Sequence, residues 1–306
     1  MSKLVDVILH ALTQGSLYAL IALGYTLVYG ILRFINFAHS DVVTIGAWVS
    51  FSLASLFGWA GTNSPVFAMP VILVLAMIIC GALGFTIERL AYRPLRRAPR
   101  LNVLITAIGV SLFLENVGLL KYTFGPNPQS MPKLLSEQPL FHLAGVAVPT
   151  VDLAVVVMAF ALMIALQWLV YRTKLGTAMR AVSFDERVAS LMGINVDRVI
   201  SITFIIGSAL AAAGGLVYGL KYGQLEVTAG AVWVLLGLKA FVAAVVGGIG
   251  NIRGAVAGAF LIAFVEHFMA SYFSPAFQDA YVFAILIVVL LVKPGGLFGA
   301  VVREKV

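Results

Sequence analysis

Long apolar runs with few charges constrain this chain more than any other sequence feature. Charge-poor segments occur at 7–32, 42–60, 65–87, 101–120, 150–171, 199–220, 232–250, 254–272 and 278–292. A helix that crosses a membrane needs about 20 predominantly apolar residues. The sequence therefore predicts an all-α polytopic membrane protein with eight or nine transmembrane helices, forming a single domain over 1–306.

Composition excludes several other classes of protein. Of the 306 residues, 61% are hydrophobic and only 11% are charged, whereas soluble domains contain about 25% charged residues. A soluble globule, a disordered chain and a nucleic-acid-binding protein are therefore excluded, and membrane lipid is the expected surroundings. The single cysteine, Cys80, lies inside an apolar run and allows no intrachain disulfide.

Two apolar runs are interrupted by polar or glycine-rich segments, at 33–41 and 249–254. Irregular backbone at membrane depth is tolerated only where protein buries it or where it lines a wet cavity. Both interruptions are therefore expected on the inner side of the helix bundle. A weak similarity between 30–50 and 247–262 also suggests an internal repeat, an arrangement that many transporters have.

The charged residues between the apolar runs predict the orientation in the membrane. Segment 88–100 has five Arg and one Glu, and segment 172–198 has five basic and three acidic residues. The tail 293–306 has three basic residues and one acidic residue, whereas the charges balance in 121–152 and 221–231. Lys and Arg accumulate on the cytoplasmic side, so 88–100, 172–198 and the C-terminus are predicted to be cytoplasmic.

Motifs for enzyme chemistry are absent from the sequence. It has no Gly-Lys dipeptide and hence no phosphate-binding loop. It also has no metal-ligand spacing of His and Cys and no G-x-S-x-G nucleophile motif. We therefore expect neither catalytic residues nor a bound metal, and the His267–Glu266 neighbours are interpreted as local polar packing.

A few polar side chains lie inside or beside the apolar runs. They are Asn36, His39, Asp41, Glu115, Lys239 and Glu266. Such residues normally face a cavity or a partner, because a charge at the centre of a membrane helix costs at least about 2.5–3.5 kcal/mol. Asn36, His39, Asp41 and Glu115 are candidates for a translocation path. The alternative is an interhelical ion pair, for which Glu115 with Lys239 is the expected combination.

Segment 172–198 contains an amphipathic pattern at 183–193. Ser183 and Glu186 are spaced as a capping box at the start of a helix of about ten residues, and Gly193 is placed to end it. The apolar residues of this pattern are Phe184, Val188, Leu191 and Met192. They form one stripe on the expected helix. Docking to a cytoplasmic partner is favoured over lying on the lipid surface, because the polar face is mixed and begins with acidic residues.

Five stretches together resemble the branched-chain amino acid (LivH-type) permease subunits of ABC importers, and the resemblance covers nearly the whole chain. They are Gly15–Gly30 (GSLYALIALGYTLVYG), Ile35–His39 (INFAH), Glu88–Arg96 (ERLAYRPLR), Leu191–Arg198 (LMGINVDR) and Gly237–Gly250 (GLKAFVAAVVGGIG). Segment 172–198 resembles the cytoplasmic coupling loop of these permeases. The chain departs from the family pattern at Ser40, where Gly is usual, and at 223–231, which lacks an Asn-Pro pair.

The resemblance implies a subunit of a heteromeric importer in the bacterial cytoplasmic (inner) membrane. Its partners would be a second permease subunit, two cytoplasmic ATPases and an external substrate-binding protein. ATP would be bound by the ATPases, so this chain would hold no cofactor of its own. The 183–193 helix would transmit the closure of the ATPases to the membrane spans.

Other functions remain open at this point. Relatives with this architecture are thought to carry urea, amides or small organic acids in place of branched-chain amino acids. An ion-coupled secondary transporter would use Glu115, Glu266 or Asp41 as its ion site, and a channel or scaffold subunit would need no energy source. The missing phosphate-binding loop and the cytoplasmic helix favour the ABC importer.

Overall fold

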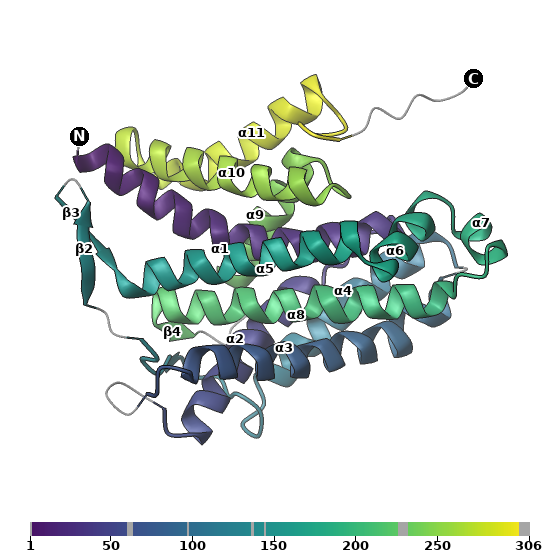
Figure 1. Cartoon of the computed structure of the whole chain (residues 1–306), viewed down its shortest axis with the longest axis horizontal. Helices are drawn as coiled ribbons and strands as arrows, with labels where there is room; N and C mark the ends of the chain where they lie inside the picture. Colours follow the sequence, from purple (N-terminus) through teal and green to yellow (C-terminus); the bar gives the residue numbers. More distant parts are fainter. Residues whose placement is uncertain are drawn as a thin grey trace.

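A computed structural model describes residues 2–59, 64–96, 98–135, 138–143, 145–225 and 232–299 as a bundle of helices (Figure 1). The longer helices are α1 (Ser2–Leu32), α2 (His39–Leu56), α3 (Ala68–Ile87), α4 (Arg100–Gly118), α5 (Thr150–Arg172), α8 (Val196–Tyr222), α9 (Val232–Gly247), α10 (Ile252–Tyr272) and α11 (Gln278–Val292). Two shorter helices, α6 (Lys174–Phe184) and α7 (Glu186–Leu191), lie at one end of the bundle. A π-helical turn at Glu88–Tyr92 and a 3₁₀ turn at Arg93–Leu95 extend α3, and a further 3₁₀ turn, Pro275–Phe277, precedes α11.

Seven of the described helical segments are long and apolar enough to cross a membrane. They cover 3–32, 68–95, 101–118, 150–172, 196–222, 252–272 and 275–292. A shorter apolar helix covers 233–247, and α2 runs beside α3 and α8 in the same bundle. The prediction of an all-helical polytopic protein is therefore confirmed, and the seven segments, the shorter apolar helix and α2 together agree with the eight or nine spans expected.

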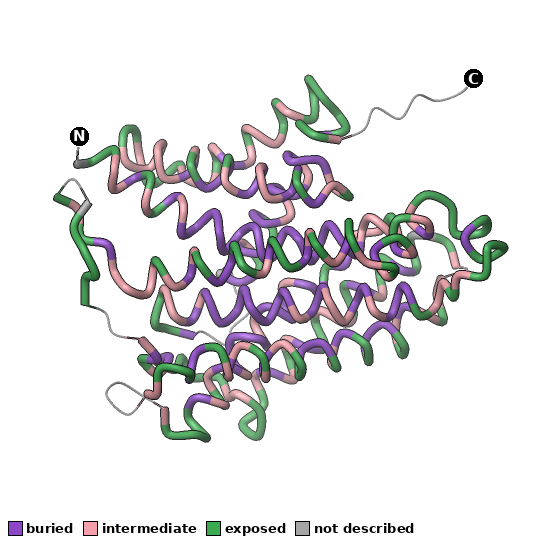
Figure 2. The backbone as a smooth tube through the Cα atoms, in the orientation of Figure 1, coloured by how far each residue is buried: buried purple, intermediate pink, exposed green. Residues whose placement is uncertain are grey.

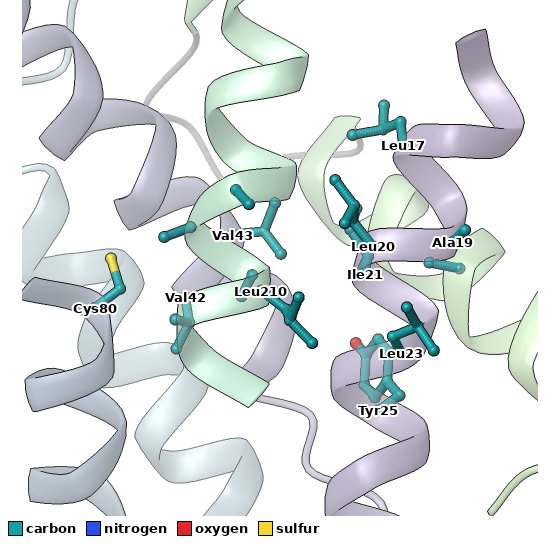
Figure 3. Packing of buried hydrophobic residues seen from close by; sticks show 14 of the residues in the cluster. Leu17, Ala19, Leu20, Ile21, Leu23, Tyr25, Val42, Val43, Cys80 and Leu210 are labelled. Carbon is teal, nitrogen blue, oxygen red and sulfur yellow. The ribbon is translucent and has the colours of Figure 1, made fainter. Parts of the chain in front are cut away.

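The centre of the bundle is formed by α1 and α8, which are buried over most of their length (Figure 2). Leu20 and Ile21 of α1 face Leu210 of α8 and Val43 of α2 in a continuous apolar cluster (Figure 3). On one side this centre is covered by α2 and α3, and on the other by α9 and α10. In contrast, α4 and α11 expose most of their apolar side chains, as lipid-facing helices do.

Small residues allow the central helices to approach closely. A Cβ atom added to Gly215 of α8 would lie 2.2 Å from the carbonyl oxygen of Val43 in α2. A Cβ added to Gly258 of α10 would lie 2.2 Å from the carbonyl oxygen of Ala243 in α9. Lipid provides no hydrophobic force between helices, so such backbone-to-backbone packing is a main source of their association.

Both predicted interruptions are only partly buried: Asn36 and His39 lie inside the protein, whereas Arg33 and Gly250 are exposed. In the first, Arg33 has a positive φ of 53°, and the side-chain oxygen of Asn36 accepts a 2.6 Å hydrogen bond from the hydroxyl of Tyr92. In the second, Asn251 caps α10 by accepting from the backbone N–H groups of Arg253 and Gly254. The two interruptions meet where α1 ends, since a Cβ at Gly30 would lie 3.6 Å from the Cα of Gly250. The internal repeat stays a prediction.

Short strands, which the sequence did not predict, lie at the opposite end of the bundle from α7 (Figure 1). β2 (Pro139–Leu143) and β3 (Val146–Pro149) pair antiparallel, and β1 (Gln129–Ser130) pairs with β4 (Gln224–Leu225). The first pair belongs to the charge-balanced segment 121–152, which is predicted to be external.

Candidate functional site

The Arg-rich segments 88–100 and 172–198 come together at one end of the bundle, hereafter the Arg-rich end (Figure 1). Arg93 and Arg96 both pair with Asp197, at the start of α8. Arg96 also pairs with Glu88, which is fully buried and accepts a 2.7 Å hydrogen bond from the Ser201 hydroxyl. The network joins the end of α3 to the start of α8, and its shared location agrees with the predicted common side of the membrane. Residues 300–306 of the C-terminal tail lie outside the described residues.

Segment 183–193 is organised differently from the predicted capping box. The cap of α7 is Asp185, whose carboxylate accepts from the backbone N–H groups of Arg187 and Val188. Ser183 instead belongs to the end of α6, and its hydroxyl donates a 2.5 Å hydrogen bond to the carbonyl of Gly30. The capping-box prediction at Ser183 and Glu186 is therefore wrong, because the intervening Asp185 is an equally good cap and lies two residues closer to the N–H groups.

The helix is also shorter than expected. α7 covers only Glu186–Leu191, and it follows α6 after the single extended residue Asp185. Gly193, with a φ of 82°, follows the end of α7, as predicted. The element is thus a pair of short helices, α6 and α7, and not one helix of ten residues.

The predicted apolar stripe projects away from the protein. Phe184, Leu191 and Met192 are 88%, 86% and 78% exposed, and Val188 is 54% exposed. On the opposite side of α7, Ala189 is buried against the rest of the chain. A cavity of about 930 Å³ lies between α7 and residues 93–96, and its lining includes Glu186, Ser190 and Leu191. The described chain thus presents an uncovered apolar surface beside a polar groove.

The segment that carries this apolar surface is hydrogen-bonded to the end of α1. Besides the bond from Ser183 to Gly30, the guanidinium of Arg33 donates a 3.2 Å hydrogen bond to the carbonyl of Ser183. Both partners lie at the end of α1, beside the first interruption. A displacement of α6 and α7 would therefore act on α1, the most central helix, through two hydrogen bonds. No pattern in the sequence indicates this connection, because the bonded residues are 150 and 153 positions apart.

The four polar candidates for the translocation path separate into two pairs. Asn36 is bonded to Tyr92, and His39 packs against Gly24 and lies 3.2 Å from the carbonyl oxygen of Ile21. These contacts give both side chains a structural role.

Asp41 and Glu115 are arranged differently, since both line one small cavity between α2 and α4. The cavity of about 20 Å³ has room for roughly one water molecule. One carboxylate oxygen of Asp41 is buried without a hydrogen-bond partner among the described residues. Asp41 and Glu115 are therefore the stronger candidates of the four.

The ion pair expected between Glu115 and Lys239 is not formed. The ammonium of Lys239 in α9 lies 2.6 Å from the carboxylate of Glu266 in α10 and 2.5 Å from that of Asp279 in α11. Glu266 also accepts a 2.7 Å hydrogen bond from the hydroxyl of Tyr18 in α1. Lys239 and Glu266 were recognised in the sequence as buried ionisable residues, but pairing across helices depends on their packing, which spacing along the chain does not give.

A scan against protein families matches residues 7–290 to the family described as the permease component of branched-chain amino acid transport systems. The chain is 40% identical to the high-affinity branched-chain amino acid transport permease BraD of Pseudomonas aeruginosa, over 98% of this chain and 97% of the relative. It is equally similar to the permease LivH of Escherichia coli K12, over 97% and 96%. A ribose import permease of Haemophilus influenzae is 24% identical over 80% of this chain.

The fold and these matches define the chain as a multi-pass permease of the cytoplasmic membrane. It belongs to the family of permease components of branched-chain amino acid transport systems. The expected family and membrane location are confirmed, and the relatives that match are transport permeases.

Proposed function

We propose that this chain is the membrane-spanning permease subunit of an ABC importer for branched-chain or related amino acids. Its near full-length similarity to two high-affinity branched-chain amino acid permeases supports the substrate class. It would work with a second permease subunit, two cytoplasmic ATPases that bind ATP, and an external substrate-binding protein.

The observation that carries the mechanism is the exposed apolar stripe of Phe184, Val188, Leu191 and Met192 at the Arg-rich end. Apolar side chains so exposed in a region rich in charge mark an interaction site. We assign the stripe, with the neighbouring groove, to an ATPase subunit. Closure of the ATPases then moves α6 and α7, and the bonds of Ser183 and Arg33 transmit this movement to α1.

The test is a charge in the middle of the stripe. Leu191→Asp should abolish substrate-stimulated ATP hydrolysis and uptake in the reconstituted complex, because the contact would bury a carboxylate without a partner, at a cost of several kcal/mol. The side chain is exposed in the chain itself, so the variant should insert and pair with the second permease normally. Lys174→Gln changes an exposed residue of α6 that belongs to neither the stripe nor the groove, and it should reduce coupling far less.

Two results would contradict the assignment. Full stimulation of ATP hydrolysis by loaded binding protein in Leu191→Asp would show that α7 is not the coupling element. Uptake that collapses with an uncoupler while ATP is held constant would favour an ion-coupled transporter instead.

The substrate needs a separate experiment. Loading the binding protein with urea, amides or organic acids, in parallel with leucine, isoleucine and valine, would identify the substrate.

For the translocation path, the proposal assigns Asp41 and Glu115 to its polar lining and leaves Asn36 and His39 as supports of the first interruption. Asp41→Asn and Glu115→Gln should each lower uptake while assembly with the ATPases persists. Normal uptake by both variants would leave these carboxylates as packing residues.

A further inference from the structure

A second cavity at the Arg-rich end has a mixed lining. It encloses about 390 Å³ between the end of α3 and the start of α8. Its polar lining comprises Arg89, Arg93, Asn195, Asp197, Arg198 and Ser201, and its apolar lining comprises Phe85, Ile202 and Ile205. The Arg93–Asp197 ion pair belongs both to this cavity and to the groove beside α7, so it separates the two.

The charges around this cavity do not cancel. Asp197 is the one carboxylate of the lining, and it is already paired with Arg93 and with Arg96. No carboxylate among the described residues lies within ion-pair distance of Arg89 or Arg198, and both are exposed. The guanidinium of Arg89 lies only over the ring of Phe85, 5.9 Å from its centre. The lining therefore carries an excess of two positive charges, which are available to a ligand.

The position of the cavity specifies what kind of ligand would fit. Its charged residues lie where α3 ends and α8 begins, the level at which membrane helices meet the lipid headgroups. Its apolar residues continue along both helices toward the membrane interior, with Ile202 and Ile205 about one and two turns beyond Arg198 in α8. On α3, Ile78 and Phe85 are exposed on the same apolar helix.

We propose that this cavity binds the headgroup of an anionic phospholipid of the cytoplasmic leaflet. The phosphate would accept hydrogen bonds from Arg89 and Arg198, and an acyl chain would lie against Phe85, Ile202 and Ile205. Basic pockets between membrane helices on the cytoplasmic side bind anionic headgroups in this way. Guanidinium groups suit phosphate because their planar N–H donors match its oxygens.

The cavity fits a lipid better than an ATPase surface, because its charged half lies at headgroup level and its apolar half lies deeper, toward the membrane interior. A soluble protein partner would place its own residues at headgroup level and leave Ile205 against lipid tails, whereas one phospholipid satisfies both halves. The exposed stripe of α7 lies beyond the Arg93–Asp197 pair and provides a separate surface for a protein partner.

The experiment is native mass spectrometry of the full-length chain, alone and in its assembled complex, from nanodiscs that contain phosphatidylglycerol or cardiolipin mixed with phosphatidylcholine. The wild type should retain an anionic lipid in preference to phosphatidylcholine. The double variant Arg89→Gln/Arg198→Gln should retain it about 30-fold more weakly, since each basic side chain near an anionic surface contributes about 1 kcal/mol. Arg172→Gln removes an exposed Arg from the same end of the bundle, outside the cavity, and should leave retention unchanged.

If the double variant folds poorly, the single variants Arg89→Gln and Arg198→Gln provide the same test, because each should weaken retention of the anionic lipid by about fivefold. Equal retention by wild type and the Arg89 and Arg198 variants would overturn the proposal. A loss of lipid retention in Arg172→Gln as large as in the Arg89 and Arg198 variants would also overturn it, because it would indicate non-specific attraction to the Arg-rich end. Displacement of the lipid by inorganic phosphate alone, at the same concentration, would show a free-anion site, and loss of lipid on ATPase assembly would show a protein interface. The readout is independent of transport, so its failure leaves the proposed function untouched.

Discussion

Lys239 is a charged side chain held inside an apolar bundle by three other helices. Glu266 and Asp279 neutralise its charge, and Tyr18 and Gln278 donate hydrogen bonds to Glu266. Lys239 and Glu266 are almost fully buried, whereas Asp279 is half exposed. Removing one member of such a pair is far more damaging than removing both, because the remaining charge has lost its partner in a medium of low polarity.

This difference gives a prediction for Lys239→Met. The variant should lose about 3–5 kcal/mol of stability, because Glu266 remains charged and buried. The double variant Lys239→Met/Glu266→Gln should recover most of this loss, since Gln can still accept from Tyr18. Denaturant unfolding in detergent measures both, and a double variant that is less stable than Lys239→Met would show that the pair is not the main source of stability here.

At the scale of the helices, the backbone contact between α2 and α8 sets the shape of the bundle. The Cβ that Gly215 lacks would collide with the Val43 carbonyl and the Ala47 backbone nitrogen, at 2.2 and 2.5 Å. A collision with backbone cannot be relieved by a side-chain rotation, so the two helices would have to move apart. Asp41 also lies on α2, and its cavity separates α2 from α4, so a shift of α2 away from α8 would change the cavity as well as the stability.

Gly215→Ala should therefore destabilise the protein by about 1–3 kcal/mol, the usual cost of overpacking. Gly109→Ala is the matched control, because Gly109 lies in α4 with no atom within 4 Å of the added Cβ. That change should be neutral or stabilise the helix by up to about 1 kcal/mol. Thermal unfolding midpoints of the two variants provide the comparison, and a Gly215→Ala midpoint equal to that of wild type would contradict the close contact.

For the molecule as a whole, the sequence predicted the features that depend on local composition. The apolar runs gave the membrane helices, and the Arg bias placed 88–100 and 172–198 at one end, where Arg93 and Arg96 meet Asp197. The predictions that depended on distant partners were less successful. Lys239 was assigned to Glu115 because the sequence does not show that α9 packs against α10 and α11.

The same limit applies to the coupling segment. The four residues of its apolar stripe are exposed, but they do not lie on one helix, because Phe184 ends α6 whereas Val188, Leu191 and Met192 belong to α7 and its C-terminal cap. Its cap was assigned wrongly, since Ser183 and Asp185 are both good capping residues and the choice depends on the carbonyl of Gly30, far away in the sequence. Spacing therefore predicts exposed apolar residues better than it predicts which residue caps a helix.

The orientation of the whole molecule is the remaining prediction, and cysteine labelling in intact cells tests it. The native Cys80 is buried, so an introduced cysteine provides the signal. Ser190→Cys, at the Arg-rich end, should resist an impermeant thiol reagent applied outside, because five basic residues in 172–198 hold that end in the cytoplasm. Tyr122→Cys, in the charge-balanced segment after α4, should be labelled, because its side chain is fully exposed at the other end.

Permeabilised cells that lack the ATPases provide the control for Ser190→Cys, which should then be labelled as readily as Tyr122→Cys. Without that control, protection by a docked ATPase could be mistaken for protection by the membrane. Labelling of Ser190→Cys from outside in intact cells would show that the orientation is the reverse of the predicted one. It would place the apolar stripe of α7 on the external face, where no ATPase can reach it, and would also place the cavity of Arg89 and Arg198 in the wrong leaflet. The coupling surface and the lipid site therefore both depend on this one measurement.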